Sequence, residues 1–148
     1  MTARTITSDK LPQEAAEKFG YSIAVRTGDT VWVSGQVALS DGQIVGVDDI
    51  EAQSVQVFEN LKEVLAAAGT DFSSVVSTTT YMTDRSFSLP INDVRKRYLT
   101  GPVLPTSTLL VVAGLARPEF LVEISAVAVL SNRRAAPASI RPSNPRGD

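Results

Sequence analysis

Residues 121–130, with the sequence LVEISAVAVL, constrain the fold of this chain more than any other segment. Successive side chains of a strand point to opposite faces, so an extended segment with this sequence is mostly apolar on both faces. A strand of that kind is typical of the middle of a sheet whose two faces are both covered. Glu123 is the only charged residue of the run, and burying a carboxylate costs free energy unless it is hydrogen-bonded or paired.

The remaining segments predict an α+β domain. Runs rich in β-branched or aromatic residues predict strands at 4–7, 21–26, 30–34, 43–45, 74–82, 106–113 and 121–130, with a hairpin turn at Thr27-Gly28-Asp29. Apolar residues recur every three or four positions at 50–68 and 87–98, which predicts two amphipathic helices. Asp48 followed by Glu51 resembles a capping box for the first of them, and a further helical turn is expected around 14–18.

The order of these elements predicts an α+β layer, a mixed sheet with two helices on one face. Two helices are too few to cover both faces of the sheet. We therefore expect the second face to be buried against another copy of the chain, in a homo-oligomer. Residues 1–130 form a single predicted domain, and 131–148, rich in arginine and proline, are expected to be a disordered tail.

Composition excludes several classes of chemistry. The 148 residues include no cysteine and no histidine, which removes disulfides, thiolate nucleophiles, imidazole bases and the usual zinc ligands. A net charge of −2 argues against broad electrostatic binding of nucleic acid, and no phosphate-binding glycine motif is present. No apolar run approaches the length of a membrane span and no signal peptide is evident, so the cytoplasm is the expected compartment.

A few polar residues are candidates for a functional site. Glu123 is either a general acid or base with a raised pKa or a structural glutamate held by hydrogen bonds. Tyr21 follows a glycine, and Ser34 opens a Ser-Gly-Gln sequence, so each stands either beside a ligand or in an ordinary turn. Ser107 lies in a hydroxyl cluster with no base to activate it, and the basic run 95–97 is more typical of a solvated helix face.

Taken together, the motifs resemble the RidA family, also called YjgF and, in older terms, the L-PSP endoribonuclease group. The matching segments are 20–22 (GYS), 28–36 (GDTVWVSGQ), the helix at 49–69, 81–84 (YMTD), Phe87, Asn92, Pro105 and 122–128 (VEISAVA). The resemblance covers roughly residues 5–130. Each motif is weak when taken singly, and the combination is specific.

The resemblance implies a chorismate-mutase-like fold that assembles as a homotrimer, with the sheets forming an inner barrel and small-molecule clefts between subunits. Members with the complete site hydrolyse reactive enamines and imines to 2-keto acids and ammonia without metal or cofactor. By position, Tyr21, Ser34, Asn92 and Glu123 correspond to cleft residues, and Glu123 is the one associated with the hydrolytic water.

One position departs from the family pattern. Deaminating members carry an arginine two residues after the proline that opens the penultimate strand, and here Ser107 follows Pro105 at that spacing. A serine hydroxyl offers no charge and no bidentate clamp for a carboxylate, which argues against ordinary deamination of 2-imino acids. The sequence leaves three hypotheses: a cofactor-free hydrolase of imines, enamines or related carbonyl compounds, a non-catalytic ligand-binding trimer, and a ribonuclease, which the charge disfavours.

Overall fold

The computed structural model describes residues 1–131, and the predicted tail therefore lies outside the described residues except for its first member. The strands are β1 (Arg4–Thr5), β2 (Ala24–Thr27), β3 (Thr30–Gln36), β4 (Leu39–Ser40), β5 (Gln43–Ile44), β6 (Val75–Met82), β7 (Thr106–Val111) and β8 (Val122–Val129). The α-helices are α1 (Gln13–Lys18), α2 (Ile50–Ala67) and α3 (Ser88–Tyr98), and short 3-10 turns at Phe72–Ser74 and Arg85–Phe87 precede β6 and α3. The predicted α+β class is confirmed.

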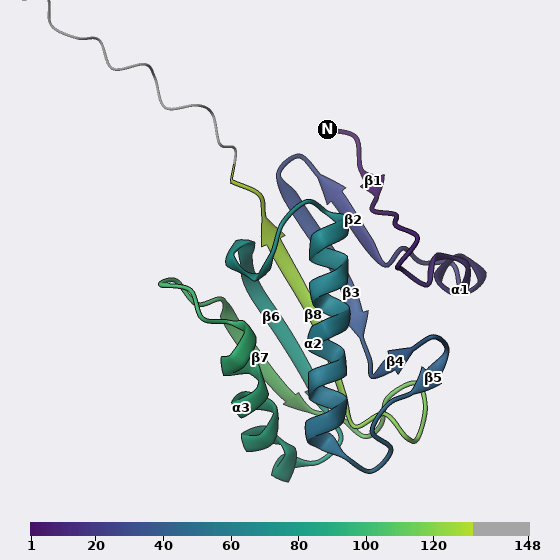
Figure 1. Ribbon diagram of the computed structural model, residues 1–148, viewed down its shortest axis with the longest axis vertical. Helices are drawn as coiled ribbons and strands as arrows, with labels where there is room; N and C mark the ends of the chain where they lie inside the picture. Colours follow the sequence, from purple (N-terminus) through teal and green to yellow (C-terminus); the bar gives the residue numbers. More distant parts are fainter. Residues whose placement is uncertain (132–148) are drawn as a thin grey trace, which may run out of the picture.

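Six strands form one mixed sheet in the order β1-β2-β3-β8-β6-β7. The last strand of the chain described by the structure, β8, lies between β3 and β6, and its two apolar faces predicted this central position. It is antiparallel to both neighbours. The pair β6–β7 is the parallel one, and β7 forms an edge of the sheet (Figure 1). The central position of β8 places Glu123 inside the sheet rather than at its margin.

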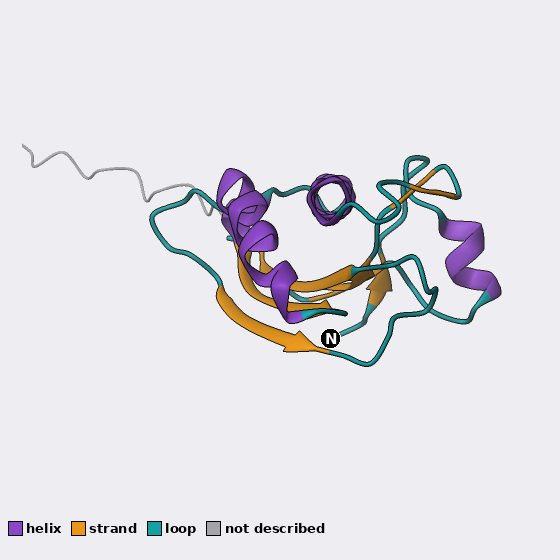
Figure 2. Ribbon diagram, turned by 90° about the horizontal axis from the view of Figure 1, so that it is seen from below, coloured by secondary structure: helices purple, strands orange, loops and turns teal. Residues whose placement is uncertain are grey.

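The two long helices cover one face of the sheet, and the third lies to the side (Figure 2). From the sheet, Val122, Ile124, Ala126 and Ala128 of β8 face α2 and are at most 5% exposed. From α2, Val57, Phe58, Leu61 and Leu65 are buried against them. The first helix α1, where the sequence indicated only a turn, lies away from the centre of the sheet.

The N-terminus of α2 differs by one residue from the prediction. Asp49, not Asp48, is the N-cap, and its carboxylate accepts a hydrogen bond from the amide of Ala52 at 2.9 Å. Asp48 instead adopts a left-handed conformation with φ of 60°. Two consecutive aspartates are equally good caps by residue type, so the backbone decides between them: Asp48 is left-handed, whereas Asp49 has the extended conformation of an N-cap.

The other face of the sheet carries apolar side chains that nothing in residues 1–131 covers. Trp32 of β3 is 54% exposed, Leu110 of β7 is 44% exposed and Val129 of β8 is 43% exposed. The register places Trp32 beside Val127 and Leu110 beside Tyr81, so all of these side chains share the face opposite the helices. We call this surface the open face, and Glu123 also points toward it.

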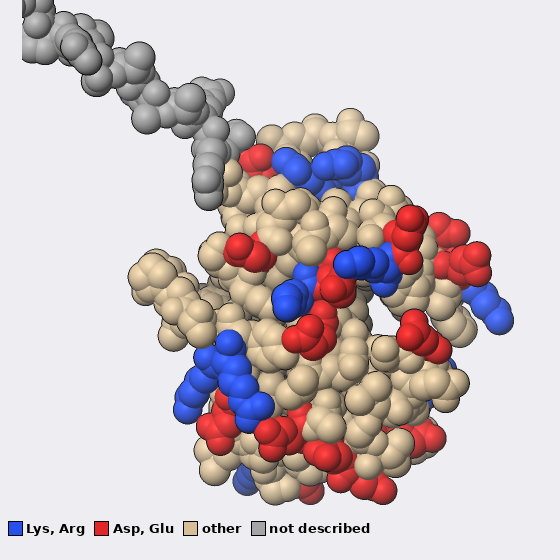
Figure 3. All heavy atoms as spheres, viewed as in Figure 1, with Lys and Arg blue, Asp and Glu red and all other residues tan. Residues whose placement is uncertain are grey.

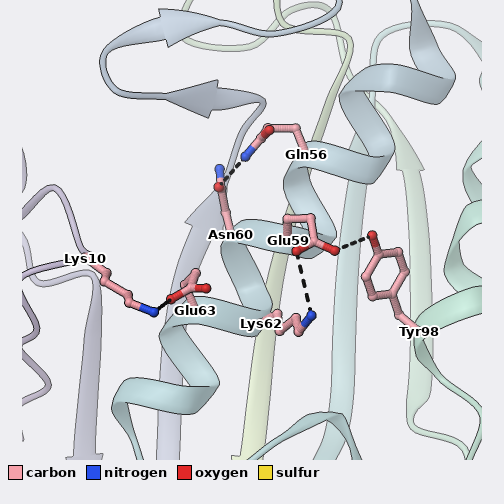
Figure 4. Close-up of polar contacts among 7 residues, drawn as sticks. All are labelled: Lys10, Gln56, Glu59, Asn60, Lys62, Glu63 and Tyr98. Carbon is pink, nitrogen blue, oxygen red and sulfur yellow. Dashed lines mark hydrogen bonds and ion pairs between the residues drawn. The ribbon is translucent and has the colours of Figure 1, made fainter.

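An aromatic cluster holds α3 against α2. The ring of Tyr98 stacks on Phe58 with centroids 5.0 Å apart and meets Phe72 edge-on at 5.6 Å. The Tyr98 hydroxyl donates to Glu59 at 2.8 Å (Figure 4), and burial together with this carboxylate raises the pKa of Tyr98 to about 12. The same view shows Lys62 beside Glu59 and, one helical turn on, Lys10 beside Glu63, both pairs at the surface.

A buried glutamine ties α2 to two loops. Gln53 is fully buried, and its amide nitrogen donates to the carbonyls of Gly46 at 3.1 Å and Glu119 at 2.7 Å. Its carbonyl oxygen accepts from the amide of Leu121 at 2.9 Å, directly before β8 begins. The side chain therefore fixes the entry of β8, which sets the position of Glu123 along the sheet.

We predict that Gln53→Leu destabilises the protein by about 3 kcal/mol, because it leaves two backbone carbonyls and one amide without partners in the interior. Urea denaturation at fixed protein concentration measures the change. Gln56→Leu, one turn along the same helix, removes a single hydrogen bond to Asn60 and should cost less than about 1 kcal/mol. Equal losses for the two variants would contradict the role given to Gln53.

Candidate functional site

The carboxyl group of Glu123 occupies the space that a side chain at position 35 would need. A Cβ atom built on Gly35 would lie 2.7 Å from the carboxyl carbon of Glu123 and closer still to Oε1. The approach depends on an irregularity between β3 and β8, where Val33 pairs with Ala126 but Gln36 pairs with Ile124. Three steps on β3 thus oppose two on β8, and the bulge turns Gly35 toward the carboxyl group.

Burial raises the pKa of the half-buried Glu123 carboxyl above its ordinary value. Within residues 1–131 this carboxyl makes no hydrogen bond and no ion pair with another side chain. Desolvation without a compensating partner favours the neutral form and leaves both oxygens free for a water molecule or a ligand. The carboxyl is therefore suited to exchange protons with a bound molecule.

Ser34 and Tyr21 belong to the same part of the molecule as Glu123. Ser34 precedes Gly35 on β3, and its hydroxyl donates to the carbonyl of Ser22 at 2.7 Å. Its amide donates to the carbonyl of Ile23, which anchors the segment after Tyr21 beside β3. Tyr21 follows Gly20, whose φ is 77°, and the tyrosine side chain is 51% exposed.

Ser107 forms a second group with Arg95 of α3 and Thr78 of β6, and Asn92 precedes Arg95 by one turn on the same helix. Ser107 pairs with Thr78 of β6 in the parallel register. Arg95, one helical turn after Asn92, extends across this pair and donates to the Ser107 hydroxyl at 2.8 Å and to the Thr78 hydroxyl at 2.8 Å. A guanidinium therefore lies beside Ser107, and it is supplied by α3 rather than by β7.

The two groups are separated within one chain. Glu123 pairs with Tyr81 and Tyr81 with Leu110, so Ser107 lies two strands and three residues away from Glu123, about 14 Å between Cα atoms. Glu123 faces the open side of the sheet, whereas Ser107 shares the helix side with buried Thr78.

Two hollows on the described surface have volumes of about 520 and 550 Å³. The residues that line them include neither Glu123 nor Ser107, so neither hollow is the candidate site.

Sequence reasoning overlooked two residues of these groups. The Ser-Gly-Gln sequence predicts a turn or a ligand approach at Gly35, and the contact that excludes a side chain there depends on the bulge. The sequence predicts a solvated helix face for Arg95 and its two basic neighbours. Its spacing of three residues from Asn92 places both on one side of α3, which is the only sequence signal for its position.

The family model described as Endoribonuclease L-PSP matches residues 12–130. The chain is 38% identical to protein DfrA of Myxococcus xanthus, covering 87% of this chain and 97% of that protein. It is 41% identical to 2-iminobutanoate/2-iminopropanoate deaminase of Mus musculus, over 74% of this chain and 80% of the mouse protein.

Solved structures agree with the sequence comparison. A putative endoribonuclease from Thermotoga maritima has a TM-score of 0.77 at 34% identity, covering 86% of this chain and 98% of that one. RidA from the Antarctic bacterium Psychrobacter sp. PAMC 21119 has a TM-score of 0.71 at 33% identity, with 86% and 99% coverage.

A mixed six-stranded sheet with two long helices on one face and a glutamate in its central strand defines an α+β protein of the RidA type. The chain belongs to the endoribonuclease L-PSP family, which is the RidA/YjgF family. None of the helices within residues 1–131 has the length and apolarity that crossing a membrane requires.

We predict that Gly35→Ala destabilises the protein by about 1–3 kcal/mol, because the new methyl group overlaps the Glu123 carboxyl and forces it to move. In a Glu123→Ala background the same substitution should cost almost nothing, since the overlapping atoms are gone. Denaturation of the four proteins of this double-mutant cycle measures the coupling. Gly114→Ala, at a glycine with no neighbour within 4 Å, is the control, and an uncoupled cycle would contradict the contact.

Proposed function

We propose that this protein is a cofactor-free hydrolase of reactive imines and enamines. The observation that supports the proposal most directly is the placement of the Glu123 carboxyl, which is half-buried against Gly35 and has no side-chain partner within residues 1–131. Burial also raises the pKa of this carboxyl. Relatives named 2-iminobutanoate/2-iminopropanoate deaminase from mouse, rat and human are 34% to 41% identical to this chain. Hydrolysis of an imine requires water and proton transfer, and one carboxyl group is sufficient to carry the protons.

The reaction uses the same carboxyl twice. Glu123 first accepts a proton from water as the water oxygen attacks the carbon of the C=N bond, and then returns this proton to the nitrogen. The resulting carbinolamine loses its hydroxyl proton to Glu123 while the carbonyl forms, and the nitrogen takes up that proton as the C–N bond breaks. The products are a carbonyl compound and ammonia, so water and imine are the only reactants.

The proposed site is formed between copies of the chain in a homotrimer. An imine of a few atoms cannot contact Glu123 and Ser107 of one chain, because about 14 Å and the sheet itself lie between them. The open face of the sheet presents Trp32, Leu110 and Val129 to solvent, and a second copy would bury these apolar side chains. In this arrangement Tyr21, Ser34 and Glu123 of one copy face Asn92 and Ser107 of another.

A second candidate function is a ligand-binding trimer without catalysis. Ser107, at the position where deaminating members carry an arginine, is the observation that favours it. This function requires the cleft but not proton transfer, so Glu123 would be dispensable for binding. The assay of Glu123 variants therefore distinguishes the two candidates.

We expect the wild-type protein to accelerate ammonia release from the 2-imino acids that an amino-acid oxidase generates in situ. Ser107 itself offers their carboxylate no charge, but the guanidinium of Arg95 donates to the Ser107 hydroxyl and supplies a positive charge there. Glu123→Gln should lower the rate at least about 100-fold, because the amide keeps the shape and cannot accept a proton. Glu119→Gln makes the same change at an exposed carboxylate and should leave the rate unchanged. Wild-type activity should decline as the pH falls through the raised pKa of Glu123, since the protonated carboxyl cannot act as a base.

Equal rates for wild type and Glu123→Gln would contradict the proposed mechanism. Binding of imine or keto-acid ligands without any acceleration of hydrolysis would favour the non-catalytic trimer.

We also expect a particle of three times 15.8 kDa in light scattering at micromolar concentration. Trp32→Asp should dissociate it, because a carboxylate would be buried among apolar side chains of the interface. Leu89→Asp changes a 74% exposed leucine of α3 on the helix side and should leave the trimer intact. Trp32 is the only tryptophan, so its emission should shift to shorter wavelength in the trimer. A stable wild-type monomer would contradict the proposal.

A further inference from the structure

The basic run on α3 does not act as one charged surface. Lys and Arg side chains gather over this helix in Figure 3, but their partners differ. Lys96 lies 3.6 Å from Asp93 and Arg97 lies 2.7 Å from Glu51, so both cations are paired with carboxylates. Arg95 has no carboxylate within ion-pair distance in residues 1–131, and its two side-chain partners are hydroxyl groups.

Arg95 is also the least exposed residue of the basic run, so water solvates its charge less than that of Lys96 or Arg97. Its side chain is half-buried, and burial lowers the pKa of the guanidinium by disfavouring the charged form. Thr78, which accepts from one end of the guanidinium, is 3% exposed, whereas Ser107 at the other end is exposed on the edge strand. The guanidinium thus lies between the interior and the surface, and within residues 1–131 its side-chain partners are neutral hydroxyls that provide no counterion.

The two hydroxyls hold the guanidinium in one orientation and leave donors free. A guanidinium carries five N–H groups, and the Ser107 and Thr78 hydroxyls each accept one hydrogen bond. An oriented guanidinium with free N–H groups matches the geometry of a carboxylate, which it binds in bidentate fashion. Asn92 lies one turn earlier on α3, so its amide is available on the same side of the helix.

We propose that Arg95 binds the carboxylate of the substrate, and that Ser107 and Thr78 are its positioning residues. The inference rests on the proposed function and assigns recognition of a carboxylate next to the C=N bond to a residue of α3. A short side chain at position 107 suits this role, because one as long as arginine on β7 would fill the space that the Arg95 guanidinium occupies. A positive charge is therefore present beside Ser107, and it is supplied by α3 instead of β7.

The competing explanation is that Arg95 merely ties α3 to the edge strand. A structural tie predicts that its loss weakens binding of all ligands equally or lowers stability alone. An anion-binding residue predicts that its loss removes the preference for a carboxylate over an uncharged group of the same shape. Pyruvate and pyruvamide form such a pair, since they differ only in the carboxylate that the amide replaces.

The test compares binding of pyruvate and pyruvamide to the full-length protein by NMR titration. We expect wild type to bind pyruvate at least about 10-fold more tightly, and Arg95→Gln to reduce this ratio to near one. The ratio is measured within a single preparation, so it does not depend on the fraction of folded protein. Arg97→Gln removes a paired cation from the same helix and should keep the wild-type ratio.

A second variant leaves Arg95 in place and neutralises it. Ser107→Asp puts a carboxylate within reach of the guanidinium and should abolish the preference for pyruvate, whereas the uncharged Ser107→Asn should retain most of it. No wild-type preference, or an unchanged ratio in both Arg95→Gln and Ser107→Asp, would overturn the proposal. Because binding is measured without turnover, failure of the hydrolase proposal appears separately, as carboxylate-selective binding with no ammonia release.

Discussion

The position of β8 in the middle of the sheet is the constraint on which the rest of the molecule depends. One face of this strand packs Val122, Ile124, Ala126 and Ala128 under α2, which accounts for much of the buried core. Alternation then forces Glu123 onto the opposite face, which none of the helices in residues 1–131 covers. A carboxyl in that position is too far inside the sheet to be fully hydrated, and the absence of a side chain at Gly35 is what lets it fit. The same geometry gives the open face its chemistry, a titratable carboxyl group within an apolar surface.

Much of this fold could be predicted from sequence because its signals are periodic and local. The two-faced apolar run predicted a central strand, and the spacing of apolar residues predicted α2 and α3 close to their observed bounds. The N-cap of α2 was misplaced by one residue because Asp48 and Asp49 differ in backbone conformation rather than in chemistry. The six-residue α1 shows the same limit, since so short a helix carries too few turns for its period to be distinguished.

The candidate site is less predictable, because its contacts join elements that are distant in sequence. Glu123 could be singled out as a carboxylate in an apolar strand, but its contact with Gly35 exists only because the register slips between Val33 and Gln36. The reach of Arg95 to Ser107 and Thr78 requires the packing of α3 over two neighbouring strands, which the aromatic stack of Tyr98 on Phe58 fixes. No local sequence pattern predicts either the bulge or the stacking of Tyr98 on Phe58.

The position of a charge in a binding site can change while the charge itself is kept. An arginine on β7 would extend from an exposed edge strand, whereas Arg95 extends from a helix that the Phe58–Tyr98 stack holds in place. In the proposed site the helix-borne side chain would lose less conformational freedom on binding an anion, because two hydroxyls already orient it. Comparing β7 alone, position by position, would therefore miss this cation, since the residue that supplies it lies on a different element. The position of the guanidinium, between Thr78 in the interior and Ser107 at the edge, is what the proposed specificity depends on.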